Sequence, residues 1–136
     1  MPRFADTNVL LYSISKSSAD AGKQVMAATI LETEDVVLST QVVGEFYVQA
    51  TRPHAVGRLT HQQARDVIGS FVTLPVQSVT YPVVTAAFGI RQRFGISYWD
   101  ALIIEAARAG GCTEVLSEDL SDTQDYLGVR VTNPFS

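Results

Sequence analysis

Short apolar runs alternate along the chain with longer segments in which apolar residues recur at helical spacing. The short runs, which predict strands, are Arg3–Ala5, Val36–Leu38, Leu74–Val79, Thr113–Leu116 and Val129–Thr132. The longer segments, which predict helices, begin after Asp6 and then cover Ala21–Leu31, Gln41–Thr51, Thr60–Val72, Tyr81–Phe94 and Trp99–Ala109. This alternation favours an α/β fold in which a mostly parallel sheet carries helices on both faces.

The segment Trp99–Ala109 is apolar on almost every side, and a helix of that kind belongs in a core. Its few charges begin with Asp100. Ser97 is a good N-cap with Asp100 three positions later, as in a capping box, and Gly110-Gly111 supplies a left-handed stop. Neutralising the helix N-terminus is the simplest role for Asp100. A functional role requires that other carboxylates converge on it.

The composition limits the kind of protein and the kind of metal site. With 136 residues, 46% of them hydrophobic, the chain fits one domain, residues 1–136, with a proper core. No apolar run approaches the roughly 20 residues of a membrane span, and no leader precedes Asp6, so we expect a cytoplasmic protein without a membrane partner. One cysteine, Cys112, and two histidines, His54 and His61, cannot form a zinc cluster. Any metal must be held by oxygen.

Four acids from separate segments lie near the carboxyl ends of predicted strands or open the following helix. They are Asp6, Glu45, Asp100 and Asp119. Strand carboxyl ends line one ligand-binding edge of an open α/β sheet, so all four acids can meet there. Clustered carboxylates repel unless a cation compensates them, and Mg²⁺ or Mn²⁺ prefers such oxygen ligands and supports phosphodiester cleavage. Each acid alone also has a structural interpretation, as a cap, a turn residue or a solvent-facing residue.

Basic residues are concentrated in the stretch Thr51–Arg65, which contains no acid. Its arginines are Arg52, Arg58 and Arg65, and Arg91 and Arg93 lie shortly before Asp100. They are candidate contacts to phosphate, although a solvated surface or a helix C-terminus also explains them. The net charge of −4 argues against a phosphate partner at face value. If four of the 14 acids belong to a metal site, however, the other ten match the ten lysines and arginines in number.

Four fragments, in this order, resemble a known family. They are Phe4–Leu10, Gln41–Phe46, Ser97–Ile103 and Leu116–Leu120. Together they resemble PIN-domain ribonucleases, and the closing Val129–Phe135 is similar to the ending of VapC-type toxins. The resemblance covers the whole length. It implies a PIN-like three-layer α/β/α fold and a Mg²⁺- or Mn²⁺-dependent endoribonuclease whose acidic set is Asp6, Glu45, Asp100 and Asp119.

The resemblance also implies further roles and partners. The expected metal ligands are Asp6, Asp100 and Asp119. The expected supporting residues are Thr7, Asn8, Ser117 and Asp122. The resemblance implies an RNA substrate. From the basic stretch and the end of the preceding helix, we expect its backbone to be guided by Arg52, Arg58, Arg65, Arg91 and Arg93. The expected protein partners are a second copy in a homodimer and a cognate antitoxin that silences the site.

Other functions remain open on the sequence. A receiver-type phosphoacceptor needs a lysine after the later strands, and the only lysines are Lys16 and Lys23. A haloacid-dehalogenase-like phosphatase needs a second Asp two residues after Asp6, where Asn8 stands. A catalytically silent PIN-like module that binds RNA or protein, and an RNA-processing nuclease without an antitoxin, both stay compatible with the motifs.

Overall fold

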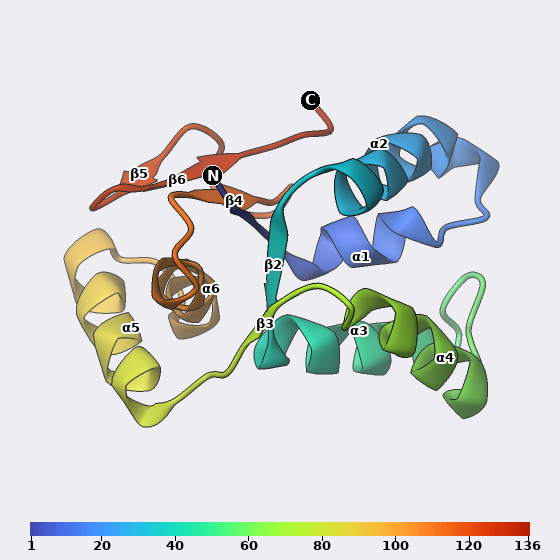
Figure 1. Cartoon of the computed structure of the whole chain (residues 1–136), viewed down its shortest axis with the longest axis horizontal. Coiled ribbons are helices and arrows are strands. Elements are labelled where there is room, and N and C mark those ends of the chain that lie inside the picture. Colours follow the sequence, from blue (N-terminus) through green and yellow to red (C-terminus); the bar gives the residue numbers. More distant parts are fainter.

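A six-stranded sheet flanked by helices makes up the computed structural model, which describes residues 1–136 (Figure 1). The strands are β1 (Arg3–Ala5), β2 (Val36–Ser39), β3 (Val76–Gln77), β4 (Glu114–Leu116), β5 (Asp125–Tyr126) and β6 (Val129–Thr132). The α-helices are α1 (Thr7–Ser13), α2 (Ala21–Thr33), α3 (Thr40–Thr51), α4 (His61–Phe71), α5 (Tyr81–Phe94) and α6 (Tyr98–Ala109). The strand order is β3-β2-β1-β4-β6-β5, and every pair is parallel except β5 with β6. None of the helices is long and apolar enough to cross a membrane.

The helices lie in layers on both sides of the sheet. In Figure 1, α1 and α2 pack together on one side, α5 and α6 lie on the other, and α3 and α4 pack side by side next to α1. This arrangement confirms the predicted three-layer α/β/α fold with a mostly parallel sheet. Helix α6 contacts β2, β3, β4 and β6, and its residues 101–107 are all buried. The prediction that this apolar helix lies in the core is therefore confirmed.

The end of α6 explains its two glycines. Gly111 has φ +80°, the left-handed conformation that glycine adopts without strain. Gly110 has an ordinary φ, but a Cβ atom there would lie 3.0 Å from Val37 Cγ1 on β2. The predicted left-handed stop is thus provided by Gly111 alone, while Gly110 allows the helix end to approach the sheet.

The helix starts agree with the sequence signals in part. Thr60 and Gln63 form the full capping box that was predicted at the start of α4. At α6, Ser97 Oγ accepts a hydrogen bond from Asp100 N at 3.1 Å, but the reciprocal bond from the Asp100 side chain is absent. The carboxylate of Asp100 consequently makes no hydrogen bond in the N-cap. Thr80 occupies the N-cap position of α5 without a side-chain bond.

Two short elements were not predicted. Ser18–Asp20, expected to be loop, forms a 3₁₀ turn before α2. Strand β5 pairs with β6 through a hairpin whose turn residues, Leu127 and Gly128, have φ values of 53° and 95°. Such a turn matches the twist of antiparallel strands. With only two residues, β5 is too short to show an alternating pattern.

Candidate active site

The carboxyl ends of the neighbouring strands β1 and β4 bring Asp6 and Ser117 together. Ala5 pairs with Leu116 in the parallel register, and Asp6 N donates to the Leu116 carbonyl at 3.0 Å. The Asp6 carboxylate is 7% exposed and accepts two hydrogen bonds, from Thr7 N to Oδ1 and from Ser117 Oγ to Oδ2, both at 2.7 Å. Asp6 is therefore the N-cap of α1, as its structural interpretation required, and also a buried acid at the sheet edge.

Ser117 organises the loop that follows β4. Its fully buried hydroxyl donates to Asp6 and accepts from Asp119 N at 3.1 Å and Leu120 N at 3.2 Å. Asn8 Nδ2, on the first turn of α1, donates to Asp119 Oδ2 at 3.1 Å. These bonds turn the Asp119 carboxylate toward the start of α1, beside Asp6.

Glu45 joins this region from α3. Thr7 Oγ1 donates to Glu45 Oε2 at 2.8 Å, and Gln41 Nε2 donates to Glu45 Oε1 at 2.9 Å. Both carboxylate oxygens are thus oriented by donors from two helices. Gln41 was not identified from the sequence, although its position four residues before Glu45 places both on one helix face. Its Oε1 atom is buried and has no hydrogen-bond partner.

The charges of two neighbouring acids act on the buried Asp6. Burial raises the pKa of Asp6 to about 6, the bonds from Ser117 and Thr7 oppose that shift, and the charges of Asp119 and Glu45 add to it. A buried carboxylate surrounded by two others favours a proton or a cation. The donor set consists of hard oxygen atoms, so it fits Mg²⁺ or Mn²⁺ and does not fit a metal that prefers sulfur or imidazole.

Asp100 differs from the other predicted acids. It lies half-buried in the first turn of α6 and makes no hydrogen bond to Asp6, Glu45 or Asp119. No three acidic side chains are close enough, as arranged, to hold one metal ion. Like charges separate when no cation holds them. The assignment of Asp100 as a third ligand therefore stays a prediction.

Glu118 holds the loop from its other side. Tyr12 Oη donates to Glu118 Oε1 and Lys23 Nζ donates to Oε2, each at 2.5 Å. These bonds lower the pKa of Glu118. Because Glu118 lies between Ser117 and Asp119, this clamp from α1 and α2 fixes the loop that carries the acid. No sequence pattern predicts these contacts, because the partners are about a hundred positions apart.

Residues 3–121 match the profile of the PIN domain family. The chain belongs to the PIN domain family. Among curated proteins no significant relative is found. Many solved structures share the fold, and three of them illustrate it.

A toxin-antitoxin complex from Klebsiella pneumoniae aligns with a TM-score of 0.70 at 19% identity, covering 98% of both chains. DNA-bound VapBC from Salmonella typhimurium aligns at 0.69 and 18% identity, again over 98% of both. VapC20, a sarcin-ricin loop cleaving toxin of Mycobacterium tuberculosis, aligns at 0.67 and 19%, covering 86% of this chain and 91% of the other. Identities this low establish the fold alone.

The fifth candidate acid of this PIN domain, Asp122, has a local structural contact. Its Oδ1 accepts a hydrogen bond from Asn133 N at 2.9 Å, which ties the loop after β4 to the end of β6. The side chain is exposed, and no bond links it to Asp6 or Asp119. No contact connects Asp122 to the acidic cluster, and its supporting role at the site stays a prediction.

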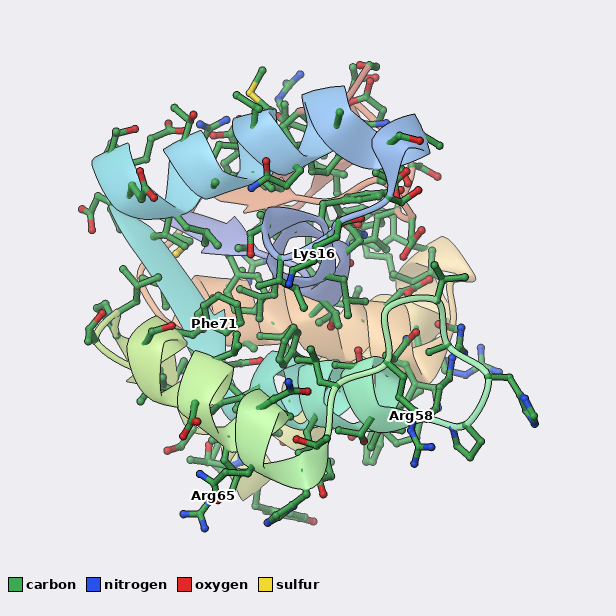
Figure 2. The ribbon with its side chains drawn as sticks, turned by 90° about the vertical axis from the view of Figure 1, so that its right-hand side faces the viewer. Lys16, Arg58, Arg65 and Phe71 are labelled. Carbon is green, nitrogen blue, oxygen red and sulfur yellow. The ribbon has the colours of Figure 1, made fainter.

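The candidate phosphate-binding arginines are exposed and fall into two groups. Arg52, Arg58 and Arg65 lie on the end of α3, the α3–α4 loop and α4, and Arg91 and Arg93 lie in the last turn of α5. Figure 2 shows Arg58 at the α3–α4 loop and Arg65 projecting outward from α4. Arg58 Nε donates to the Thr51 carbonyl at 2.8 Å, and Arg91 Nη1 reaches the Ile96 carbonyl at 3.5 Å. The fold does not bring the two groups into one strip.

Proposed function

We propose that this PIN domain is a Mg²⁺- or Mn²⁺-dependent endoribonuclease and the toxin of a toxin-antitoxin pair. The observation that carries the proposal is the buried Asp6 carboxylate, whose pKa is raised to about 6 by burial and by the neighbouring charges of Asp119 and Glu45. Such crowding disfavours the charged carboxylates and is relieved by a divalent cation. A purely structural N-cap would need neither burial nor neighbouring acids.

In this proposal Asp6 and Asp119 hold the metal, with Asp100 approaching from α6, and Glu45 completes the acidic set. Bound Mg²⁺ or Mn²⁺ would supply an activated water and charge stabilisation for hydrolysis of a phosphodiester. Ser117 orients the second oxygen of Asp6, and Asn8 orients Asp119.

Glu45 has a role of its own in the proposal. Thr7 and Gln41 each donate to one of its oxygens and so fix the direction of the carboxylate. A carboxylate oriented in this way beside Asp6 can accept a proton from an attacking water. Glu45 is therefore the general base that we propose, with Thr7 and Gln41 as its positioning residues.

The substrate in this proposal is RNA. VapC20, which shares the fold, is a toxin that cleaves the sarcin-ricin loop. The five exposed arginines would contact the RNA backbone, and their two separate locations would suit a strand that runs across α3 and α5.

The partner in this proposal is an antitoxin. Two of the chains that share the fold come from toxin-antitoxin complexes. An arginine of such a partner would pair with the carboxylates of Asp6 and Asp119 and exclude the metal, because a planar guanidinium binds carboxylates in a bidentate manner. Self-association into a homodimer is part of the same proposal.

Growth on expression tests the toxin role. Expression of the wild-type chain alone should arrest growth, co-expression of a small protein encoded beside it should relieve the arrest, and Asp6→Asn should be harmless alone. A matched variant, Asp66→Asn, changes an exposed acid of α4 and should remain toxic. Harmless expression of a folded wild-type chain would contradict the toxin role.

A further inference from the structure

A pocket on the far side of α3 from Glu45 combines cationic and aromatic groups. Its volume is about 460 Å³, and it is lined by Tyr47, Thr51, Arg58, Leu59, Thr60 and His61. Glu45 and Tyr47 are two positions apart on α3, so their side chains leave the helix on different faces. The pocket is therefore separate from the acidic cluster.

Two hydrogen bonds orient the polar groups of this pocket. Arg58 Nε donates to the Thr51 carbonyl at 2.8 Å, which fixes the guanidinium while its two terminal nitrogens make no hydrogen bond. Tyr47 Oη and His61 Nδ1 are 2.8 Å apart. With Tyr47 donating, the imidazole proton lies on Nε2, which can then donate to a ligand.

The charge of the pocket selects an anion. Its lining contains one arginine and one histidine and no acid. At the N-terminus of α4, the Gln63 N–H is bonded to Thr60 Oγ1 at 3.1 Å and is not available to a ligand. Recognition would therefore depend on the side chains of Arg58 and His61, a planar guanidinium and an imidazole that suit the oxygens of a phosphate.

The size and the aromatic wall indicate more than a bare phosphate. A cavity of about 460 Å³ lies within the range of small-molecule sites, which is roughly 300–1,000 Å³. The Tyr47 and His61 rings meet edge to face at 5.8 Å, and with Leu59 they offer an apolar wall to a ribose or base. We infer that this pocket binds one nucleotide unit of RNA, with its phosphate on Arg58 and His61 and its ribose or base against Tyr47 and Leu59.

This inference rests on the proposed function for the identity of the strand as RNA, and it adds a nucleotide subsite outside the acidic cluster. A strand bound at both places would pass around α3. The subsite would then hold a nucleotide at a fixed distance from the cleaved bond, and it would contribute to the choice of cleavage position.

The two histidines provide an internal control for a nuclear magnetic resonance test. His54 lies on the α3–α4 loop, whereas His61 is the first residue of α4, and His54 does not line the pocket. The imidazole signals, assigned with His61→Gln, would be followed in EDTA during titration with uridine monophosphate and, separately, with inorganic phosphate. We expect a saturable shift of His61 and none of His54, with the nucleotide binding more tightly than phosphate. Equal shifts of both histidines, or none, would overturn the inference.

Arginine variants complete the test. Arg58→Gln should weaken nucleotide binding by about fivefold or more, and Arg130→Gln, which changes an exposed arginine of β6 outside the RNA-binding set, should leave it unchanged. Binding of a cleavage-resistant RNA should lose about 0.7 of its log–log salt slope in Arg58→Gln and keep its slope in Arg130→Gln. If the Arg58→Gln variant binds RNA as wild type does, the inference is refuted. This includes the outcome in which the variant keeps RNA binding but no longer binds a protein partner. Saturable nucleotide binding without any nuclease activity would refute the proposed function and leave the pocket intact.

Discussion

Ser117 Oγ donates a hydrogen bond to Asp6 Oδ2 at 2.7 Å, joining the ends of β4 and β1 through fully buried atoms. The same hydroxyl accepts from the backbone N–H groups of Asp119 and Leu120. One small side chain thereby fixes one acid directly and sets the backbone that carries another. The geometry of the acidic cluster therefore depends on this serine at both Asp6 and Asp119.

Replacing Ser117 by alanine should destabilise the protein and raise the pKa of Asp6 further. The variant leaves a buried carboxylate oxygen and two backbone N–H groups without their partner, so the free energy of unfolding should fall by about 1–3 kcal/mol. Urea denaturation measures the loss. The control is Ser70→Ala, which removes an exposed hydroxyl on α4. Equal stability of both variants would show that the Ser117 bond contributes nothing.

The raised pKa of Asp6 makes the metal-free protein less stable as pH rises. The pKa lies at about 6, chiefly because of burial, against an ordinary value of 3.8 for an aspartate. When the pKa of a carboxyl group is higher in the folded protein than in the unfolded chain, its protonated form favours folding. This contribution to the free energy of unfolding is complete below the unfolded-state pKa and is lost as pH rises through the folded-state pKa of about 6. Two pKa units correspond to about 3 kcal/mol.

Asp6→Asn should therefore unfold at higher urea concentration than wild type in EDTA at about pH 8, and the difference should vanish near about pH 4. Added Mg²⁺ or Mn²⁺ should stabilise the wild type and not the variant. If the wild type is the more stable protein at the higher pH in EDTA, the capping bond from Thr7 outweighs the burial of the charge.

The clamp on Glu118 should control metal affinity at a distance. Lys23→Met and Tyr12→Phe each remove one of the two donors to Glu118 and free the loop that carries Asp119. We expect Mn²⁺ binding to weaken by about tenfold, as for other outer-shell partners. Calorimetry of Mn²⁺ binding measures the effect. Lys16→Met, an exposed lysine outside the clamp, should bind Mn²⁺ as wild type does.

Asp100→Asn separates a functional acid from a helix cap. Only the backbone N–H of Asp100 takes part in the cap with Ser97, so the amide should preserve the fold and its melting temperature. Metal-dependent cleavage should nevertheless fall steeply if Asp100 approaches the metal. A variant that unfolds, yet retains full activity per folded molecule, would return Asp100 to the role of a helix N-terminal charge.

Sequence patterns predicted the fold well because local signals and burial agree in it. The all-round apolar character of α6 and the Thr60–Gln63 capping box both have clear sequence signatures. Strand β5 was not predicted, because a strand of two residues is too short to show an alternating pattern. Asp6 and Asp119 were expected at one edge of the sheet because each follows a predicted strand. They lie there because the carboxyl ends of parallel strands meet at one edge.

Contacts between distant segments could not be predicted. Glu118 acts through Tyr12 of α1 and Lys23 of α2, which no periodicity connects to it. Gln41 and Glu45, by contrast, share a face of α3, so their spacing is a signal that the sequence does contain. Asp122 matched an acidic pattern, but its side chain is exposed and accepts from Asn133 N, eleven positions along the chain. Residue type and spacing give candidates, and only packing assigns them partners.

Cleavage of single-stranded RNA by the purified chain tests the central claim most directly. Wild type and Asp66→Asn should cleave when Mg²⁺ or Mn²⁺ is present and stop in EDTA, whereas Asp6→Asn should lose at least about a hundredfold in rate while staying folded. Circular dichroism on the same samples establishes folding. A folded wild type that leaves RNA intact in both metals, or a folded Asp6→Asn that cleaves at the wild-type rate, would contradict the account.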